Sequence, residues 1–383
     1  MWSKMIESVL SKYFTVYTQK DILEKYSMDY GSLSPILSSL RKIPKAVIKI
    51  KEEEEIKILM DLVNEYNFPV IPRGNGTNTL GEAIPLNENS VIVDMSELKG
   101  FEDKVTSIIV RPGTEFNEIG IEKLPVVPTS FNMATIGGYV AGGSLGFGSL
   151  KYGAIWDNVR QVVVYTPKGR YTLEGEDTYS VVQAAGTTGI ISQIKIAALN
   201  RPRRISVIRA GFNTLRKAID KALDLLEVAE FISIRNKAMA SIIEPYHKWD
   251  KWNLIYGIND PDEEEDLPFK DIVTTFAGAY FTVVNRTKVN YASMDISLDE
   301  LEKIDDVKCL IDAELAKSRG KYFSHTYFLG YTSLPNLKSS KFDLHSFRVN
   351  DRVEPDRLKK MVSFKRVVDP EDLLNPGKLV MNT

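Results

Sequence analysis

The chain has 383 residues, of which 43% are hydrophobic, with 49 basic and 51 acidic side chains and a net charge of −2. This length predicts one large globular domain or two closely associated ones with a substantial core. The charge balance argues against a general nucleic-acid-binding protein, which usually carries a basic excess. The single cysteine, Cys309, excludes an internal disulfide and a thiolate metal cluster and fits a reducing compartment.

The sequence shows no targeting or membrane-spanning pattern. No apolar run approaches the roughly 18 residues that a transmembrane helix needs, and the first residues lack the apolar core of a secretory signal. We therefore expect a cytoplasmic protein, either free or peripheral at the inner face of the membrane.

The N-terminal half alternates predicted strands and helices. Apolar side chains at helical spacing over residues 1–18 predict a helix packed on its own domain, with a membrane-surface or partner-docking helix as the alternative. A strand at 46–50 precedes a helix at 51–66 whose first turn is acidic, as the helix dipole favours. Further strands are predicted at 69–72, 91–95, 106–110, 160–166, 171–173 and 189–197, with another helix at 114–122.

The composition changes at the basic run 201–204, where we place a domain boundary. Strands are predicted beyond it near 205–209, 231–235, 254–258 and 274–284, and helices at 214–226 and 298–319. The last residues form a short tail with several Pro and Gly positions.

Two glycine-rich loops about sixty residues apart carry the strongest chemical indication. The first is PRGNGTN at 72–78 and the second is ATIGGYVAGG at 134–143. Glycine permits positive φ and close approach of the backbone, and successive N–H groups in such turns form an anion-binding concavity. A following helix N-terminus adds its dipole. Either loop alone could be a structural turn, but together they predict a large phosphate-bearing ligand.

The loops do not fit the common nucleotide motifs. The first lacks the third glycine of the dinucleotide fingerprint and the Lys-Ser/Thr ending of a phosphate loop, so a Rossmann dehydrogenase and a P-loop ATPase are both poor fits. Several motifs instead stand in the order of another family. They are the segments 44–47, 70–78, 91–96, 110–113, 134–138, 152–153, 189–192, 369–370 and 375–378.

In these segments the chain resembles the FAD-linked superfamily of vanillyl-alcohol oxidase and p-cresol methylhydroxylase, nearest its glycolate oxidase and D-lactate dehydrogenase branch. The resemblance implies an α+β fold, with a two-subdomain FAD-binding domain of the p-cresol methylhydroxylase type and a smaller α+β cap. It implies an FAD-binding domain at 1–203 with a helical leader, a cap or substrate domain at 204–354, and a tail at 355–383 that returns to the FAD domain.

The resemblance also assigns cofactor-binding roles, with the first loop around the pyrophosphate and later segments along the flavin and the adenosine half. The residues implied are Pro72, Arg73, Gly74, Asn75, Gly76, Thr77, Asn78, Pro128, Thr129, Ala134, Thr135, Ile136, Gly137, Gly138, Ala141, Gly142, Gly143, Ser144, Tyr152, Gly189, Ile190, Ile191, Asn375 and Lys378. Some members tether FAD through histidine or cysteine. Here Thr77-Asn78 occupies the histidine position and Cys309 lies far away, so FAD is expected to bind non-covalently.

Oxidation of an alcohol needs a base for the hydroxyl proton and, for an acid substrate, a cation for the carboxylate. An alternating strand would point His325 and Tyr327 to one face, which makes His325 the first candidate base, with a structural histidine as the alternative. His345 is the second candidate, with Arg348 as a carboxylate clamp. The histidine-rich metal-binding segment of many hydroxy-acid enzymes is absent, so no metal site is predicted.

The resulting expectation is an FAD-linked oxidase or dehydrogenase acting on a CH–OH group by hydride transfer to flavin N5. A 2-hydroxy acid such as glycolate or D-lactate is the favoured substrate. A sugar, polyol or lactone oxidase, and a non-catalytic flavin-binding subunit of a larger oxidase complex, are the alternatives. The electron acceptor stays open among oxygen, a quinone-linked partner, a cytochrome and an iron–sulfur partner. The sequence also leaves the oligomeric state open.

Overall fold

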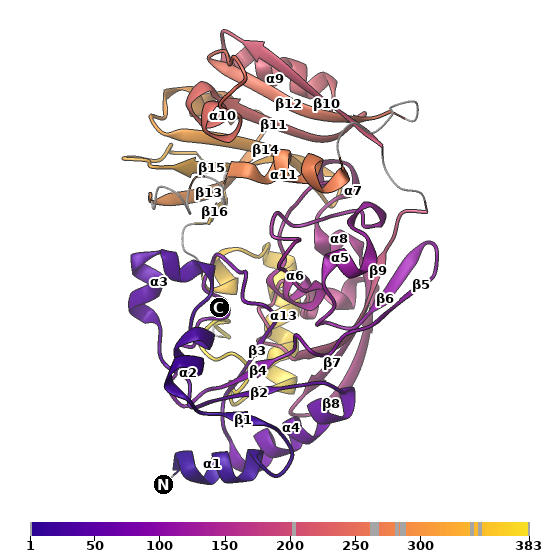
Figure 1. The fold of residues 1–383 in the computed structure, drawn as a ribbon, viewed down its shortest axis with the longest axis vertical. Helices are drawn as coiled ribbons and strands as arrows, with labels where there is room; N and C mark the ends of the chain where they lie inside the picture. Colours follow the sequence, from indigo (N-terminus) through magenta and orange to yellow (C-terminus); the bar gives the residue numbers. More distant parts are fainter. Residues whose placement is uncertain are drawn as a thin grey trace.

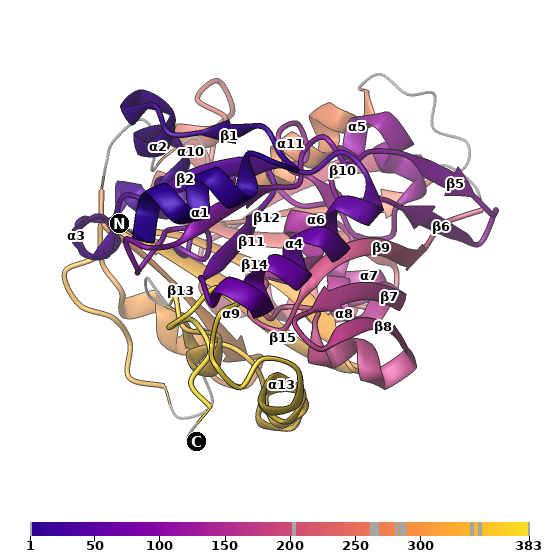
Figure 2. The ribbon, with the colours of Figure 1, turned by 90° about the horizontal axis from the view of Figure 1, so that it is seen from below.

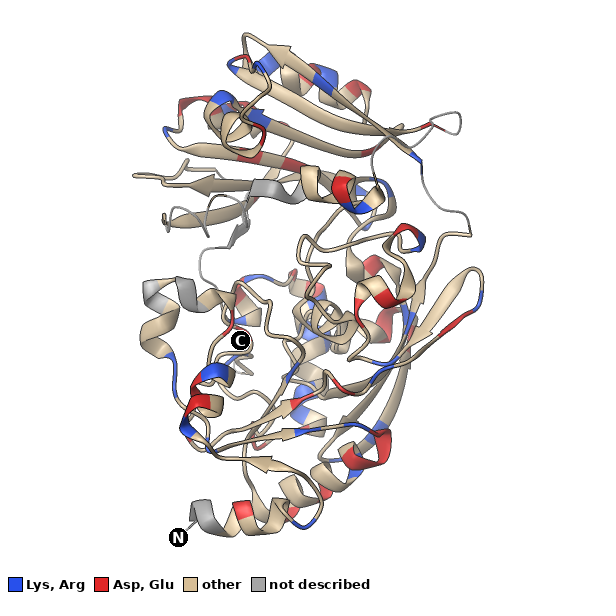
Figure 3. Cartoon of the chain, viewed as in Figure 1, with Lys and Arg blue, Asp and Glu red and all other residues tan. Residues whose placement is uncertain are grey.

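The computed structural model describes residues 2–200, 204–260, 268–279, 283, 289–337, 341–343 and 347–381. In Figure 1 the described chain forms a lower half, here called the base (2–200 and 347–381), and an upper half, here called the cap (204–343). Both ends of the chain lie in the base. Acidic and basic residues are interspersed over both halves (Figure 3), as the near-neutral net charge suggests.

The first base sheet has the order β1-β2-β4-β3, with β2 and β3 parallel to β4. Its strands are β1 (Val16–Tyr17), β2 (Ala46–Lys49), β3 (Val70–Arg73) and β4 (Val91–Asp94). Helix α4 (Glu53–Tyr66) begins with a capping box and buries its apolar stripe in the same core as these strands. Helix α1 (Trp2–Leu10) packs into that core through Ile6, Val9 and Leu10, which agrees with a helix docked on its own domain.

The second base sheet has the antiparallel order β5-β6-β9-β7-β8. Its strands are β5 (Phe101–Asp103), β6 (Ser107–Val110), β7 (Val159–Thr166), β8 (Gly169–Glu174) and β9 (Ile190–Ala197). The short helices between β6 and β7 are α5 (Phe116–Ile119), α6 (Ile136–Gly142), α7 (Ser149–Tyr152) and α8 (Ile155–Asn158). Seen from below, α1 and α4 lie over the underside of the base and α13 (Pro355–Val368) lies at its edge (Figure 2).

The cap is an antiparallel sheet in the order β10-β12-β11-β14-β15-β13-β16. Its strands are β10 (Ile205–Phe212), β11 (Ala229–Asn236), β12 (Trp252–Asn259), β13 (Tyr291–Ser297), β14 (Leu310–Ser318), β15 (Lys321–Leu329) and β16 (Lys341–Asp343). Helix α9 (Leu215–Asp224) buries its amphipathic face on the outer side of this sheet. The inner side faces the base, and α10 (Lys237–Ile243) and α11 (Phe269–Ala279) complete the cap.

Two predicted cap elements are wrong. The predicted helix at 298–319 is a short 3-10 helix, Leu301–Asp306, followed by strand β14. Alanine, leucine and glutamate favour a helix there, but Ile311, Ala313 and Leu315 alternate into the core under α9. The predicted strand at 274–284 begins inside helix α11, whose buried Phe269, Ile272, Val273 and Phe276 follow a helical period.

Base and cap share one apolar core. The ring of Phe147 in the base lies 5.2 Å from Phe231, 5.4 Å from Phe269 and 5.8 Å from Phe276, all three of which belong to the cap. The chain is back in the base by Val349, which packs against Ala184 and Ala185. The cap is therefore an insertion held on the base by a continuous hydrophobic contact.

Candidate cofactor and substrate site

A large cavity lies between the base and the cap. Its base side is formed by the first glycine loop and its continuation (72–80, 82 and 83), by the second loop, and by the segment 183–191. Its cap side is formed by side chains from strands β13 and β15. The two loops thus meet His325 and Tyr327 of the cap around one space.

Most of the residues expected to hold the cofactor line this cavity. They are Pro72, Arg73, Gly74, Asn75, Gly76, Thr77, Asn78, Pro128, Thr129, Ala134, Thr135, Gly137, Gly138, Ala141, Gly142, Gly143, Ser144, Gly189, Ile190 and Ile191. Ile136 lies instead in the base core, and the Tyr152 hydroxyl donates to Glu230 at 3.2 Å, away from the lining. Asn375 and Lys378 are buried behind the cavity wall.

The first loop offers backbone donors to the cavity. No acceptor in the described part of the chain takes a hydrogen bond from the N–H groups of Asn75, Gly76 or Thr77. Gly76 has φ of 69°, and a Cβ added there would lie 1.9 Å from the Arg73 guanidinium, so only glycine fits this turn. Unpaired N–H groups next to the half-buried guanidinium of Arg73 suit an anionic group, and the residues present therefore fit a diphosphate.

The second loop lines the cavity and owes its shape to close packing. Its Gly137 N–H donates to the Pro112 carbonyl at 2.8 Å, and its Gly138 N–H donates to Thr135 Oγ1 at 3.2 Å. A Cβ at Gly137 would lie 2.3 Å from Pro112 Cβ. These glycines let helix α6 pack closely against Pro112, and the N–H groups of Gly137 and Gly138 are already used within the base.

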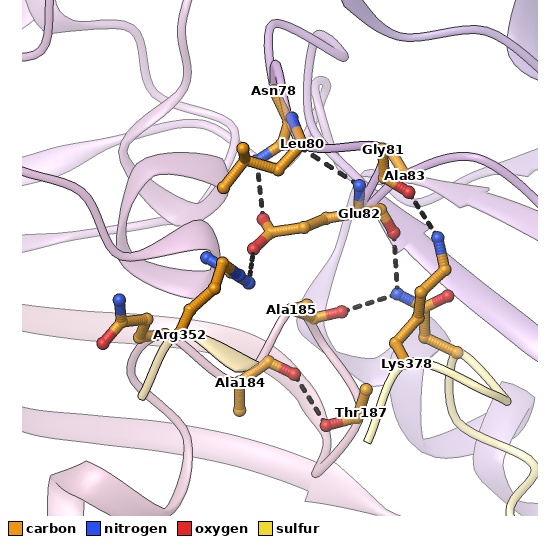
Figure 4. Close-up of polar contacts among 12 residues, drawn as sticks. Asn78, Leu80, Gly81, Glu82, Ala83, Ala184, Ala185, Thr187, Arg352 and Lys378 are labelled. Atoms are coloured by element: carbon orange, nitrogen blue, oxygen red, sulfur yellow. Dashed lines mark hydrogen bonds and ion pairs between the residues drawn. The ribbon is translucent and has the colours of Figure 1, made fainter. Parts of the chain in front are cut away.

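A buried polar network fixes the first loop from behind (Figure 4). The Glu82 carboxylate accepts from Asn78 Nδ2 at 2.6 Å and pairs with Arg352. Asn375 Nδ2 donates to the Glu82 carbonyl at 2.9 Å and to the Ala185 carbonyl at 2.7 Å. The Lys378 ammonium donates to the Gly81 carbonyl. Asn375 and Lys378 therefore hold the backbone of the loop.

Burial sets the pKa values in this network. It raises the pKa of the Glu82 carboxyl to about 7 and that of Asp29 to about 6, despite the opposing pull of nearby cations. It lowers the pKa of Lys378 to about 8. The charges behind the loop are therefore poised to change near neutral pH.

The segment at 183–186 forms another part of the wall in an unusual backbone conformation. Gln183 and Ala185 have φ of 67° and 52°, which is rare for residues with a side chain. Their N–H groups donate to the carbonyls of Val140 at 3.0 Å and Ala141 at 2.8 Å, and Arg357 donates to the Gln183 side chain. Such strain is found at functional sites, where surrounding contacts hold it in place.

The cap side of the cavity carries the candidate base. His325 Nδ1 lies 2.6 Å from Asp295 Oδ1 on the neighbouring strand. The His325 ring meets the Tyr327 ring edge-on with centroids 4.9 Å apart, and both residues line the cavity on the face expected from strand alternation. The Tyr291 hydroxyl donates to the Thr79 carbonyl at 2.8 Å, which joins the cap to the first loop.

Of the other predicted substrate residues, the structure describes only Arg348, and Arg348 does not line the cavity. His345 lies outside the residues that the structure describes. Arg348 is exposed, with its guanidinium 5.6 Å from the centroid of the Phe347 ring, and is not part of the lining. Arg352, four residues further along, lines the cavity instead. Arg348 misses the site because the chain turns back toward the base here, and the short helix Val349–Asp351 brings the later arginine inward.

Sequence reasoning missed Glu82, Arg352 and Asp295. Glu82 and Arg352 stand 270 residues apart in the chain, and Asp295 stands 30 residues from His325, so no local pattern joins them. In the described ranges, no three His, Cys, Asp or Glu side chains are grouped to hold a metal ion. Across those same ranges, every helix is too short or too polar to cross a bilayer.

Comparison with known proteins agrees with this geometry. Residues 44–173 match the family model described as FAD binding domain. The mitochondrial D-lactate dehydrogenase [cytochrome] of Arabidopsis thaliana is 29% identical over 199 residues, which is 47% of this chain and 35% of that protein. Glycolate oxidase subunit GlcD of Bacillus subtilis is 24% identical over 229 residues, 54% of this chain and 49% of that protein. The chain thus spans between about a third and a half of these relatives.

Among solved structures, an alkyldihydroxyacetonephosphate synthase superposes with a TM-score of 0.71 at 17% identity, covering 98% of this chain and 85% of that one. At this identity the similarity shows the fold alone. It confirms the expected α+β fold, and the family match over residues 44–173 confirms that its FAD-binding part is of the p-cresol methylhydroxylase type.

Proposed function

We propose that the protein is an FAD-dependent oxidoreductase. Residues 44–173 belong to the FAD binding domain family, within the superfamily of vanillyl-alcohol oxidase and p-cresol methylhydroxylase. The proposed substrate is a small hydroxylated compound, with a 2-hydroxy acid such as glycolate or D-lactate favoured. The observation that carries this proposal is the His325–Asp295 pair, which faces the cavity opposite the first glycine loop.

The roles of the residues follow from their positions. The N–H groups of Asn75, Gly76 and Thr77 would hold the diphosphate of the cofactor, and the segment 189–191 would line its remaining length. FAD, when bound, supplies the two-electron acceptor for the hydride of the substrate. Because Asp295 accepts from Nδ1 of His325, Nε2 is the nitrogen that takes the hydroxyl proton of the substrate.

Anaerobic reduction of the bound flavin tests this function. The purified protein should lose its visible absorbance with a member of a panel of 2-hydroxy acids, polyols and sugars. We expect His325→Gln to slow this reduction by about 10²–10⁴-fold, the usual contribution of a general base. His247→Gln is the matched control, because His247 is exposed and its ring is tilted against that of Trp249, with the centroids 4.2 Å apart. Equal rates in both variants would remove His325 from the mechanism.

FAD is proposed to bind without a covalent tether. Thr77 and Asn78 line the cavity at the position that can carry histidine, and Cys309 lies in the cap, in contact with the core under α9. Acid precipitation should therefore release yellow flavin into the supernatant. Colour that stays with the precipitated chain would contradict this assignment.

The name of the relative GlcD marks it as a subunit, which supports a partner protein as the electron acceptor for this chain. We propose an iron–sulfur or quinone-linked partner, and a cytoplasmic location either free or at the inner face of the membrane. If no compound of the panel bleaches the flavin until a partner is added, the chain is a flavin-binding subunit whose chemistry needs the complex.

A further inference from the structure

Arg357 on helix α13 is a buried cation with few partners. Its side chain is 1% exposed, and its one hydrogen bond within the described chain is donated from Nη2 to Oε1 of Gln183. Its Nε and Nη1 atoms are also buried and have no partner there. The guanidinium lies 4.2 Å from the centroid of the Trp156 ring and 5.7 Å from that of Tyr179. Burying a cation with so little compensation costs stability, so its bond to Gln183 is a candidate for a functional contact.

This bond fixes the orientation of the Gln183 amide. A guanidinium has donors but no acceptor, so it must meet the oxygen of the amide and not the nitrogen. Because Oε1 of Gln183 faces Arg357, Nε2 is left as the free donor of the amide. The backbone of Gln183 is held as well, with φ of 67° and an N–H bond to the Val140 carbonyl at 3.0 Å. The direction of the Nε2 donor is therefore fixed by the fold.

The Nε2 donor of Gln183 opens into the cavity. Gln183 lines the cavity, although the residue is only 6% exposed. No residue in the described ranges accepts a hydrogen bond from Nε2, and this atom is not among the unpartnered atoms that are sealed from solvent. The structure thus presents an oriented donor to whatever fills this part of the cavity.

Gln183 and the first glycine loop lie at opposite ends of helix α6. Gln183 packs against Gly143, directly after the helix, where an added Cβ would lie 2.2 Å from the Gln183 Cβ. Asn75 of the first loop donates from Nδ2 to the Met133 carbonyl at 2.9 Å, just before the helix begins. The helix has seven residues, which corresponds to about 10 Å. The group that accepts from Nε2 is therefore a different part of the ligand from a diphosphate on the first loop.

The surroundings of Nε2 suit a flat ring. Trp156, against which Arg357 stacks, lines the cavity and donates from Nε1 to Ser318 Oγ of the cap at 2.8 Å. Leu145 also lines the cavity, close in sequence to the end of α6. Aromatic and aliphatic walls with one neutral donor favour an aromatic group that carries acceptor atoms on its edge.

We propose that Gln183 donates from Nε2 to the acceptor edge of the flavin ring of bound FAD, and that Arg357 is the positioning residue that holds the amide in this orientation. The carbonyl oxygens and unprotonated nitrogens of the ring are acceptors of this kind. The inference rests on the proposed binding of FAD in this cavity and is independent of the substrate.

The affinities for FAD and ADP test this donor without any substrate. ADP shares the diphosphate and adenosine of FAD but has no flavin ring. Gln183→Glu keeps the shape and the acceptor for Arg357 but replaces the donor with a carboxylate oxygen. We expect FAD binding to weaken at least about ten-fold, because two acceptors then face each other unpaired, while ADP binding stays unchanged. Fluorescence titration of the full chain with FAD, and displacement of that FAD by ADP, give both affinities.

The control is Gln193→Glu, the same substitution on strand β9 but outside the cavity lining, which should change neither affinity. Unchanged FAD affinity in Gln183→Glu would overturn the proposal. Equal losses of FAD and ADP would also overturn it, since they would show that Gln183 only shapes the wall.

A second pair of variants tests the positioning role. Arg357→Met removes the guanidinium and frees the Gln183 amide to turn, so FAD binding should weaken about three-fold or more with ADP binding unchanged. Arg357→Lys keeps a cation that only donates, so it should restore part of the loss. Full FAD affinity in Arg357→Met would remove Arg357 from this role. If the selective loss of FAD is seen but no compound bleaches the flavin, the proposed oxidation fails and the ring contact stands.

Discussion

Gly76 shows how a single backbone position shapes the first glycine loop, which lines the proposed cofactor cavity. Alanine there would be strained at φ of 69° and would push on the Arg73 guanidinium. We expect Gly76→Ala to weaken flavin binding at least about ten-fold, since such strain costs on the order of 1–3 kcal/mol. Gly320→Ala is the control, because Gly320 has φ of 78° but no atom within 4 Å of the added Cβ. Flavin titration by fluorescence should show weaker binding in the first variant only.

Glu82 makes the stability of the folded protein depend on pH. Its pKa is raised to about 7 in the folded protein, so between the ordinary carboxyl pKa and about 7 the folded chain holds a proton that the unfolded chain has released. Its contribution to stability is therefore greatest in acid and is lost as pH rises through about 7. The melting temperature of the wild type, measured relative to Glu82→Gln, should fall from about pH 5 to about pH 8. The exposed Glu302→Gln should show no such trend, and a rising difference would refute the assignment.

At the scale of elements, the tail after α13 fixes loops that lie far away in the sequence. Asn375 bonds two carbonyls, of Glu82 and Ala185, and both flank the cavity. Asn375→Ala would leave these buried acceptors unpaired, which costs about 1–3 kcal/mol each. We expect lower stability and faster flavin loss, measured by melting and by dilution of the loaded protein. Asn350→Ala is the control, because Asn350 makes a similar bond to the exposed tail at Val380 and should retain flavin.

Elements with a local signature could be predicted from the sequence. Helix α4 has an acidic first turn and a regular apolar stripe, and the glycine loops follow short apolar strands. Strand β14 could not be predicted from the sequence, because its residues favour a helix. Only pairing with the neighbouring strands of the sheet selects the extended conformation. The same limit applies to the site, where Glu82 meets Arg352 across 270 residues.

For the molecule as a whole, the shared core predicts joint unfolding of base and cap. Phe147 contacts three cap phenylalanines, so Phe147→Ala should destabilise both halves, by about 3–5 kcal/mol. Denaturant unfolding followed by flavin fluorescence and by far-UV circular dichroism should give coincident transitions in the wild type. Phe101→Ala, at an exposed strand, should change stability little. Two separate transitions in the wild type would show that the halves unfold independently.

The bonds from residues 352–378 to the segment just after the first loop set the order in which this protein can fold and bind its cofactor. Arg352, Asn375 and Lys378 reach residues 81 and 82 across 270, 293 and 297 positions of chain. During synthesis, the first loop is complete long before these three side chains, because most of the remaining chain must be translated first. Contacts of such long sequence separation form late and slowly. Acquisition of the nucleotide is thus a post-translational event, and a nascent chain stalled before residue 375 should emerge colourless.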